Sequence, residues 1–201
     1  MTRKLLIAAI LLLALVLGWV IWFWQPARDQ AHQGISIAAA PSGGDFTLQS
    51  ANGPLSLHDL RGKVVLVYFG YTFCPDICPT SLAFTAQGLN LLDKNELART
   101  QVLFISVDPE RDTLEKLKTY GAFFHPSILG LTGTPQEIAA AARLYGASYA
   151  RQNTGSAGGY VVDHSASTYV VDPAGKLAAT LQHGTPPAEV AKVIRAVLQD
   201  K

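Results

Sequence analysis

Short uninterrupted runs of hydrophobic residues predict the inner strands of a β-sheet in the C-terminal part of the chain. Residues 64–69 read Val-Val-Leu-Val-Tyr-Phe, and residues 102–107 contain a single polar side chain. Runs of this length, rich in β-branched and aromatic residues, are typical of strands buried on both faces. A shorter apolar run at residues 128–131 predicts a third strand of the same kind.

Segments with hydrophobic residues at helical spacing follow these runs. Helices are expected over residues 81–92, 113–124 and 135–144, and a last one opens at residues 185–187. Residues 93–100 are polar and are expected to form a connection.

Three pairs of short strands complete the pattern. They are residues 46–48 with 55–57, residues 148–151 with 160–162 around the glycine-rich loop 152–159, and residues 168–171 with 176–181. The predicted order is β-β-[β-α]-[β-α]-[β-α]-β-β-α. Parallel β-α units followed by an antiparallel hairpin and a helix describe a thioredoxin-like α/β sandwich with an N-terminal β-hairpin.

The N-terminus predicts a single transmembrane helix. Residues 5–24 contain no charge, and twenty helical residues cover about 30 Å, the hydrocarbon thickness of a bilayer. Arg3 and Lys4 precede this stretch, which places the N-terminus in the cytoplasm. A cleaved signal peptide is the alternative, with residues 38–40 as a small-residue cleavage site, but its apolar core would be shorter.

These features predict four parts of the chain. Residues 1–4 form a cytoplasmic tip, residues 5–24 the anchor, residues 25–44 a tether, and residues 45–201 the folded domain. The expected location is a bacterial-type inner membrane with the C-terminal domain on the periplasmic side. Hydrophobic residues make up 49% and the formal net charge is +1, which argues against disorder and against nucleic-acid binding through bulk charge.

The only two cysteines, Cys74 and Cys78, follow the first buried strand. On the first turn of a helix, residues four apart share a face, and Pro75 suits the first helical position. A helix N-terminus also lowers the pKa of thiols. The pair could therefore form a disulfide, a redox couple or part of a metal site. Disulfide exchangers generally place two residues between their cysteines, whereas three stand here.

Among the five histidines, His164 is the candidate third ligand. It precedes the strand at residues 168–171, which in this fold neighbours the strand that ends at the cysteines. No proline occurs between Pro135 and Pro173, so the proline that exchangers place opposite their cysteines is missing. The only methionine is Met1, which excludes a thioether copper site. For His32, His58, His125 and His183 we expect solvent exposure or a structural role.

Four ordered blocks resemble the Sco/SenC family of copper chaperones, which assist copper delivery to cytochrome c oxidase. The blocks are Gly70-Tyr71-Thr72-Phe73-Cys74-Pro75-Asp76-Ile77-Cys78-Pro79, Ser106-Val107-Asp108-Pro109-Glu110-Arg111-Asp112, Leu129-Gly130-Leu131-Thr132-Gly133 and Val162-Asp163-His164-Ser165. The resemblance extends from Asp45 to the C-terminus. It implies that Cys74, Cys78 and His164 bind Cu(I), and also Cu(II), for transfer to the copper-bearing subunit of an oxidase.

The resemblance also implies a thiol reductant or an upstream copper donor as a partner. The alternative is a thiol–disulfide oxidoreductase that reduces the cysteines of the oxidase copper site, and a weaker one is a peroxidase-like relative. Asp108, Asp76 and Asp163 are candidates for contacts behind the metal ligands. For Asp108 the competing hypothesis is a helix N-cap, and for Asp76 and Asp163 it is simple solvent exposure.

Overall fold

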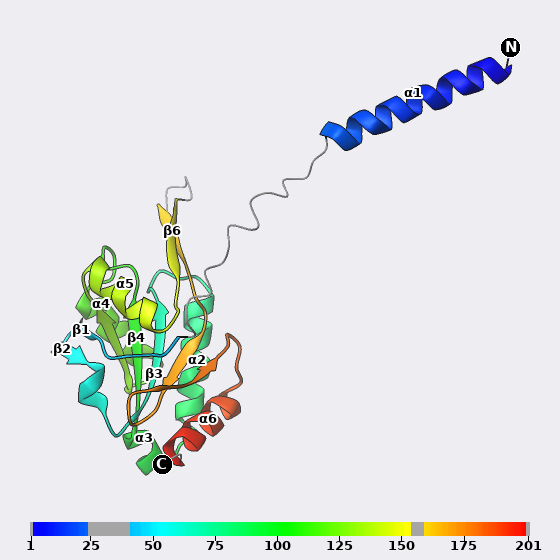
Figure 1. Cartoon of the computed structure of the whole chain (residues 1–201). Helices are drawn as coiled ribbons and strands as arrows, with labels where there is room; N and C mark the ends of the chain where they lie inside the picture. Colours follow the sequence, from blue (N-terminus) through cyan, green and yellow to red (C-terminus); the bar gives the residue numbers. More distant parts are fainter. Residues whose placement is uncertain (1, 24–40, 154–158, 200–201) are drawn as a thin grey trace. The chain divides into compact units, whose positions relative to one another are not determined.

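The computed structural model describes residues 2–23, 41–153 and 159–199, and it divides into two compact units, Met1–Ala38 and Ala39–Lys201 (Figure 1). Much of the predicted tether, including His32 and the alternative cleavage site, lies outside the described residues. In the first unit, helix α1 spans Thr2–Phe23. Over the residues that the structure describes, no helix combines the length and apolarity needed to cross a membrane. The structure thus confirms a helix over most of the apolar stretch.

The second unit is built on a seven-stranded mixed sheet. Its strand order is β2-β1-β5-β4-β3-β8-β9. The strands are β1 (Thr47–Ser50), β2 (Gly53–Ser56), β3 (Val64–Gly70), β4 (Thr100–Ser106), β5 (Ile128–Thr132), β8 (Thr168–Val171) and β9 (Leu177–Leu181). Every residue of β3 is buried, and the strand is paired on both sides within the sheet. β4 runs parallel to β3 on one side, and β8 runs antiparallel to it on the other. The predicted neighbour of the cysteine-bearing strand is therefore confirmed.

Helices cover the sheet. They are α2 (Ile77–Leu89), α3 (Lys94–Ala98), α4 (Leu114–Phe124), α5 (Pro135–Leu144) and α6 (Pro187–Gln199), with a 3-10 turn η1 at Leu57–Leu60. α2 packs against α6, and α4 packs against β5 (Figure 1). Two predictions were wrong at this level. The helix expected from residue 81 begins at Ile77, and the expected connection at residues 93–100 contains α3, which a capping box between Asp93 and Glu96 starts.

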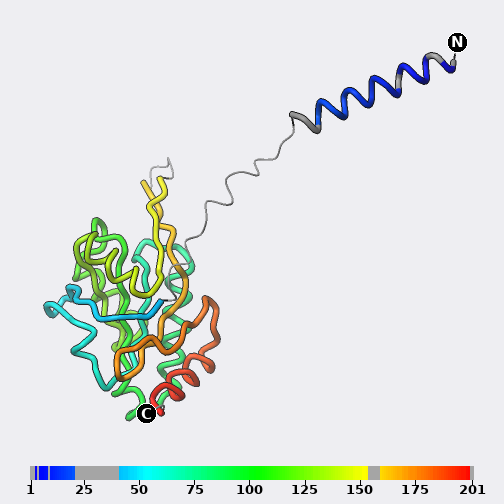
Figure 2. The backbone as a smooth tube through the Cα atoms, viewed as in Figure 1, coloured from blue at the N-terminus to red at the C-terminus, as the bar shows by residue number. Residues whose placement is uncertain are grey.

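A separate two-stranded sheet contains the strands on either side of residues 154–158. The loop was predicted over residues 152–159, but residues 152 and 153 belong to the first of these strands. β6 (Tyr149–Asn153) pairs only with β7 (Tyr160–His164), and the hairpin extends away from the rest of the unit in Figure 2. His164 is the last residue of β7, and it pairs with Tyr149, the first residue of β6. The predicted third ligand therefore lies at the base of this hairpin, where the hairpin meets the main sheet.

Candidate metal centre

The cysteines occupy the loop that joins β3 to α2. Cys74 precedes the helix, whereas Cys78 lies in its first turn. The prediction that Pro75 takes the first helical position is wrong, because Asp76 is the N-cap residue and the helix begins after it. The Cys78 N–H still points toward Cys74 Sγ at 3.4 Å, so the helix N-terminus does face this sulfur.

The end of β3 is shaped to let the helix come close. A Cβ placed on Gly70 would lie 2.6 Å from Cys78 Sγ and 2.9 Å from the Phe104 ring. Such a separation is far inside van der Waals contact, so any larger residue would displace the Cys78 sulfur. Glycine at this position is therefore required for the placement of Cys78.

His164 completes a three-residue cluster. Its Nε2 lies 3.2 Å from Cys78 Sγ, and one ligand atom from each of Cys74, Cys78 and His164 lies within 4.8 Å of the other two. His164 Nδ1 lies 3.0 Å from the Ser165 carbonyl oxygen. A carbonyl oxygen only accepts hydrogen bonds, so Nδ1 carries the proton and the Nε2 lone pair faces the sulfurs. This tautomer is the one that a metal ion needs.

The two thiols differ in their electrostatics. The pKa of Cys74 is lowered to about 4, chiefly because its sulfur accepts a hydrogen bond from the Cys78 side chain, with further hydrogen bonds from the Asp76 and Cys78 backbone N–H groups. Burial and the hydrogen bond to Cys74 raise the pKa of Cys78 well above its ordinary value. Of the two thiols, Cys74 is therefore the one that favours the thiolate form. Both are free cysteines in this structure.

A cleft of about 340 Å³ opens onto the cluster. Cys74 and His164 lie on its wall, together with Pro75 and Asp163. Cys78 is not on this wall and is fully buried. The cluster is thus open on one side, where another molecule can approach Cys74 and His164.

Aromatic rings hold the His164 imidazole from two sides. The Tyr71 ring lies edge-on to it with 5.8 Å between centroids, and the Tyr68 ring does the same at 6.0 Å. The Tyr71 hydroxyl also accepts a hydrogen bond from the Val162 N–H at 3.3 Å. Tyr71, three residues before Cys74, thus contacts the strand that carries His164.

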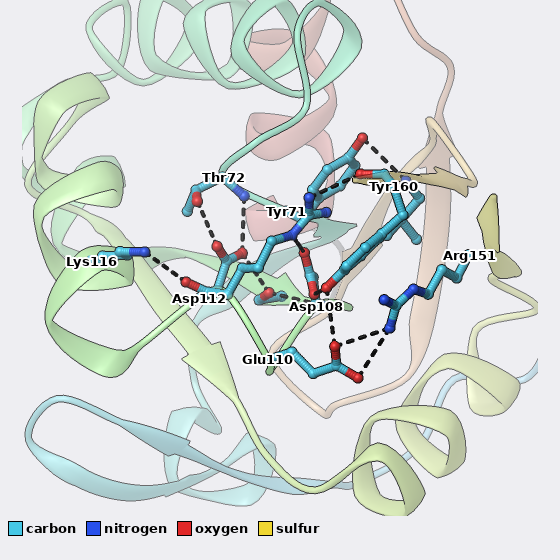
Figure 3. Close-up of polar contacts among 11 residues, drawn as sticks. Tyr71, Thr72, Asp108, Glu110, Asp112, Lys116, Arg151 and Tyr160 are labelled. Carbon is cyan, nitrogen blue, oxygen red and sulfur yellow. Dashed lines mark hydrogen bonds and ion pairs between the residues drawn. The ribbon is translucent and has the colours of Figure 1, made fainter. Parts of the chain in front are cut away.

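Asp112 links the cysteine loop to the sheet through hydrogen bonds. It was not among the residues singled out from the sequence. Its buried carboxylate accepts hydrogen bonds from the Thr72 N–H at 2.9 Å and from the Thr72 hydroxyl (Figure 3). It also accepts one from the Ser106 hydroxyl at 2.7 Å. One feature of the sequence could have pointed to Asp112. It is a second aspartate shortly after a buried strand, in the same block as Asp108. Asp112 thus fixes the loop two residues before Cys74.

The three aspartates singled out from the sequence have different surroundings. Asp108 is only 3% exposed and contacts Arg111 and the Tyr160 hydroxyl, but it hydrogen-bonds to none of the three cluster residues. The N-cap hypothesis for Asp108 is wrong, because Thr113 caps α4. Asp76 and Asp163 are exposed, and Asp76 accepts a hydrogen bond from the Thr80 hydroxyl.

The other described histidines lie outside the cluster. His58 is exposed in η1. His183 Nδ1 lies 3.0 Å from the Ser81 hydroxyl and links the segment after β9 to α2. His125 ends α4, where a cation would be favoured, but burial lowers its pKa and its Nδ1 accepts the Ser127 N–H. His125 is thus a structural residue in its neutral form.

Comparison with known proteins finds one family. The family model described as SCO1/SenC matches residues 36–199. The mouse protein "Protein SCO2 homolog, mitochondrial" is 39% identical over 163 residues, which is 77% of this chain and 64% of that protein. The chain thus matches just under two thirds of this relative.

Two solved structures extend the comparison. Arabidopsis thaliana ScoI with copper bound has a TM-score of 0.72 at 34% identity, covering 79% of this chain and 99% of that one. BsSco, described with a disulfide switch as a member of the Sco family of cytochrome c oxidase assembly proteins, has a TM-score of 0.60 at 26% identity and covers 84% and 100%. These similarities confirm the thioredoxin-like α/β fold that the sequence predicted.

Proposed function

Since this chain belongs to the SCO1/SenC family, we propose that it is a copper metallochaperone that binds copper through Cys74, Cys78 and His164 and delivers it to the copper centre of a cytochrome c oxidase. The observation that carries the proposal is the cluster itself, with three ligand atoms within 4.8 Å of one another. Relatives of known structure that contain copper support the choice of metal.

The donor set suits this cargo. Two thiolates favour Cu(I), a soft ion, and an imidazole accepts either oxidation state of copper. The low pKa of Cys74 favours its thiolate, and Nε2 of His164 faces the sulfurs, so the site presents a sulfur and a nitrogen donor before copper arrives. Binding to both sulfurs then releases the remaining thiol proton. A carrier must also release its ion, and the cleft beside Cys74 and His164 gives a recipient access to two of the three ligands.

Membrane attachment is part of the proposal. The uncharged residues 5–24 form the anchor, and Arg3 and Lys4 keep the N-terminus in the cytoplasm of a bacterial-type cell. The copper domain then lies in the periplasm. That compartment is oxidising, so a reductant or a reduced copper donor must keep Cys74 and Cys78 as thiols before loading.

Replacing His164 with alanine in the full-length protein tests the proposal. We expect Cu(I) affinity, measured by competition with a chromophoric Cu(I) chelator, to fall by roughly 100-fold, because a lost ligand should cost at least as much as the residues behind a ligand do. His183→Ala is the matched control, since His183 contacts Ser81 and not the cluster. An affinity unchanged by His164→Ala would contradict the ligand assignment.

A thiol–disulfide oxidoreductase is the second candidate, and the low pKa of Cys74 favours it, since an exchanger attacks with a thiolate. This activity requires both cysteines but not His164. Turnover of a disulfide substrate that is unchanged in His164→Ala, combined with unchanged copper affinity, would favour this candidate over the chaperone.

A further inference from the structure

The hairpin that carries His164 is not part of the main sheet. Among the strands that the structure describes, β7 pairs with β6 alone. His164 is joined to the main sheet by the short connection to Thr168 of β8, and no ladder of backbone hydrogen bonds fixes β7 against β3 or β8. The orientation of the hairpin, and with it the distance from His164 to the cysteines, therefore also depends on the side chains that dock the hairpin.

Arg111 lies where the hairpin meets the segment after β4. Its Nη1 donates to the Tyr160 carbonyl oxygen at 2.9 Å, and its guanidinium lies 3.7 Å from the centroid of the Tyr160 ring. Its Nε pairs with the Asp108 carboxylate, which also accepts the Tyr160 hydroxyl at 2.6 Å. Asp108, Arg111 and Tyr160 thus form a closed set of contacts, which we call the clasp.

The clasp also contacts the cysteine loop. The Arg111 guanidinium lies 5.0 Å from the Phe73 ring and 5.6 Å from the Tyr71 ring. Phe73 is the neighbour of Cys74, and Tyr71 packs against His164. One side chain therefore touches both elements that must converge for a three-ligand site, the loop with Cys74 and the hairpin with His164.

Two arginines, Arg111 and Arg151, pack against the Tyr160 ring, and they differ in how far their side chains are buried. Arg151 lies 3.4 Å from the Tyr160 ring centroid and pairs with Glu110, but its side chain is 50% exposed, against 20% for Arg111. Exposed ion pairs contribute little because water and salt screen them. The Arg111 contacts are shielded and are the ones able to fix the hairpin.

We infer that Arg111, through Asp108 and Tyr160, is a positioning residue that holds His164 within reach of the two sulfurs. It contacts no ligand atom itself. The inference rests on the proposed function, since it requires His164 to bind copper. It predicts that Arg111 matters for copper only as long as His164 is present.

A double-mutant cycle on the full-length protein tests this dependence. Cu(I) affinity is measured by chelator competition for the wild type, Arg111→Gln, His164→Ala and the double variant. We expect Arg111→Gln to weaken binding about tenfold, as is typical for residues behind a metal ligand, and the double variant to bind no more weakly than His164→Ala.

Two results would overturn the inference. One is an Arg111→Gln affinity within about twofold of the wild type, well short of the loss expected for a residue behind a ligand. The other is a full repeat of the Arg111 effect in the His164→Ala background, which would mean that Arg111 acts on the fold or on the cysteines. Failure of the proposed function is seen separately, as an unchanged affinity in His164→Ala alone.

Two further variants keep the test decisive. Arg111→Gln leaves the buried Asp108 carboxylate without its cation, so Asp108→Asn/Arg111→Gln provides a clasp-free protein without an unpaired buried charge. We expect the same weakening of about tenfold for it. Arg151→Gln is the matched control, and an equal loss of affinity in that variant would contradict the assignment to Arg111.

Discussion

Replacing Cys78 with serine should abolish stable Cu(I) binding in the full-length protein. Copper retained after desalting of the reduced, loaded protein should fall from about one ion per chain to near zero, since a serine hydroxyl neither ionises at neutral pH nor matches a soft cation. Cys78 is fully buried in the first turn of α2, and serine has nearly the same volume, so the fold should persist.

Ser81→Ala is the matched control for this loss. Ser81 lies on the same helix, and its hydroxyl contacts His183 and not the cluster. Copper retention should be unchanged in this variant. A Cys78→Ser protein that retains copper as the wild type does would mean that the ion is bound elsewhere.

Asp112→Ala should give the largest loss of stability among the site variants. Removal of the carboxylate leaves the Thr72 N–H and the Ser106 hydroxyl without their acceptor, and each unsatisfied buried group costs about 1–3 kcal/mol. We therefore expect the free energy of unfolding to fall by about 3 kcal/mol. Urea unfolding, followed by near-UV circular dichroism of the tyrosines, measures it.

The positions of the aromatic residues decide the spectroscopic probe for this unfolding measurement. All seven tyrosines lie between residues 68 and 169, in the C-terminal unit, whereas the three tryptophans stand at residues 19–24 of the sequence, in the N-terminal unit. Asp93→Ala is the control, because Asp93 also accepts backbone hydrogen bonds but is exposed at the start of α3. Loss of that cap should cost about 1 kcal/mol. An equal cost for Asp112→Ala would contradict its role as the buried anchor of the cysteine loop.

The sheet was predictable because burial leaves a strong pattern in the sequence. The central strand at Val64–Gly70 is apolar throughout, since helices or strands cover it on every side. The exact start of α2 was not predictable in the same way. Pro75 and Asp76 interrupt the apolar pattern just before the helix. The apolar stripe that indicates the helix begins only after Cys78.

The three residues of the cluster could be predicted from the sequence, but the residues that hold them in place could not. Cys74 and Cys78 are the only cysteines, and the fold brings the segment before β8 to the end of β3, so His164 could be found by topology. The roles of Arg111, Asp112 and Tyr160 depend on contacts between segments about 40 to 50 residues apart, which no local pattern encodes.

X-ray absorption at the copper edge of the Cu(I)-loaded, full-length protein tests the central claim most directly, because it counts the ligand atoms on the ion. The proposed site predicts two sulfur ligands and one imidazole nitrogen, with the imidazole lost in His164→Ala. A copper ion bound by sulfur alone in the wild-type protein, or a nitrogen ligand that persists in His164→Ala, would contradict it.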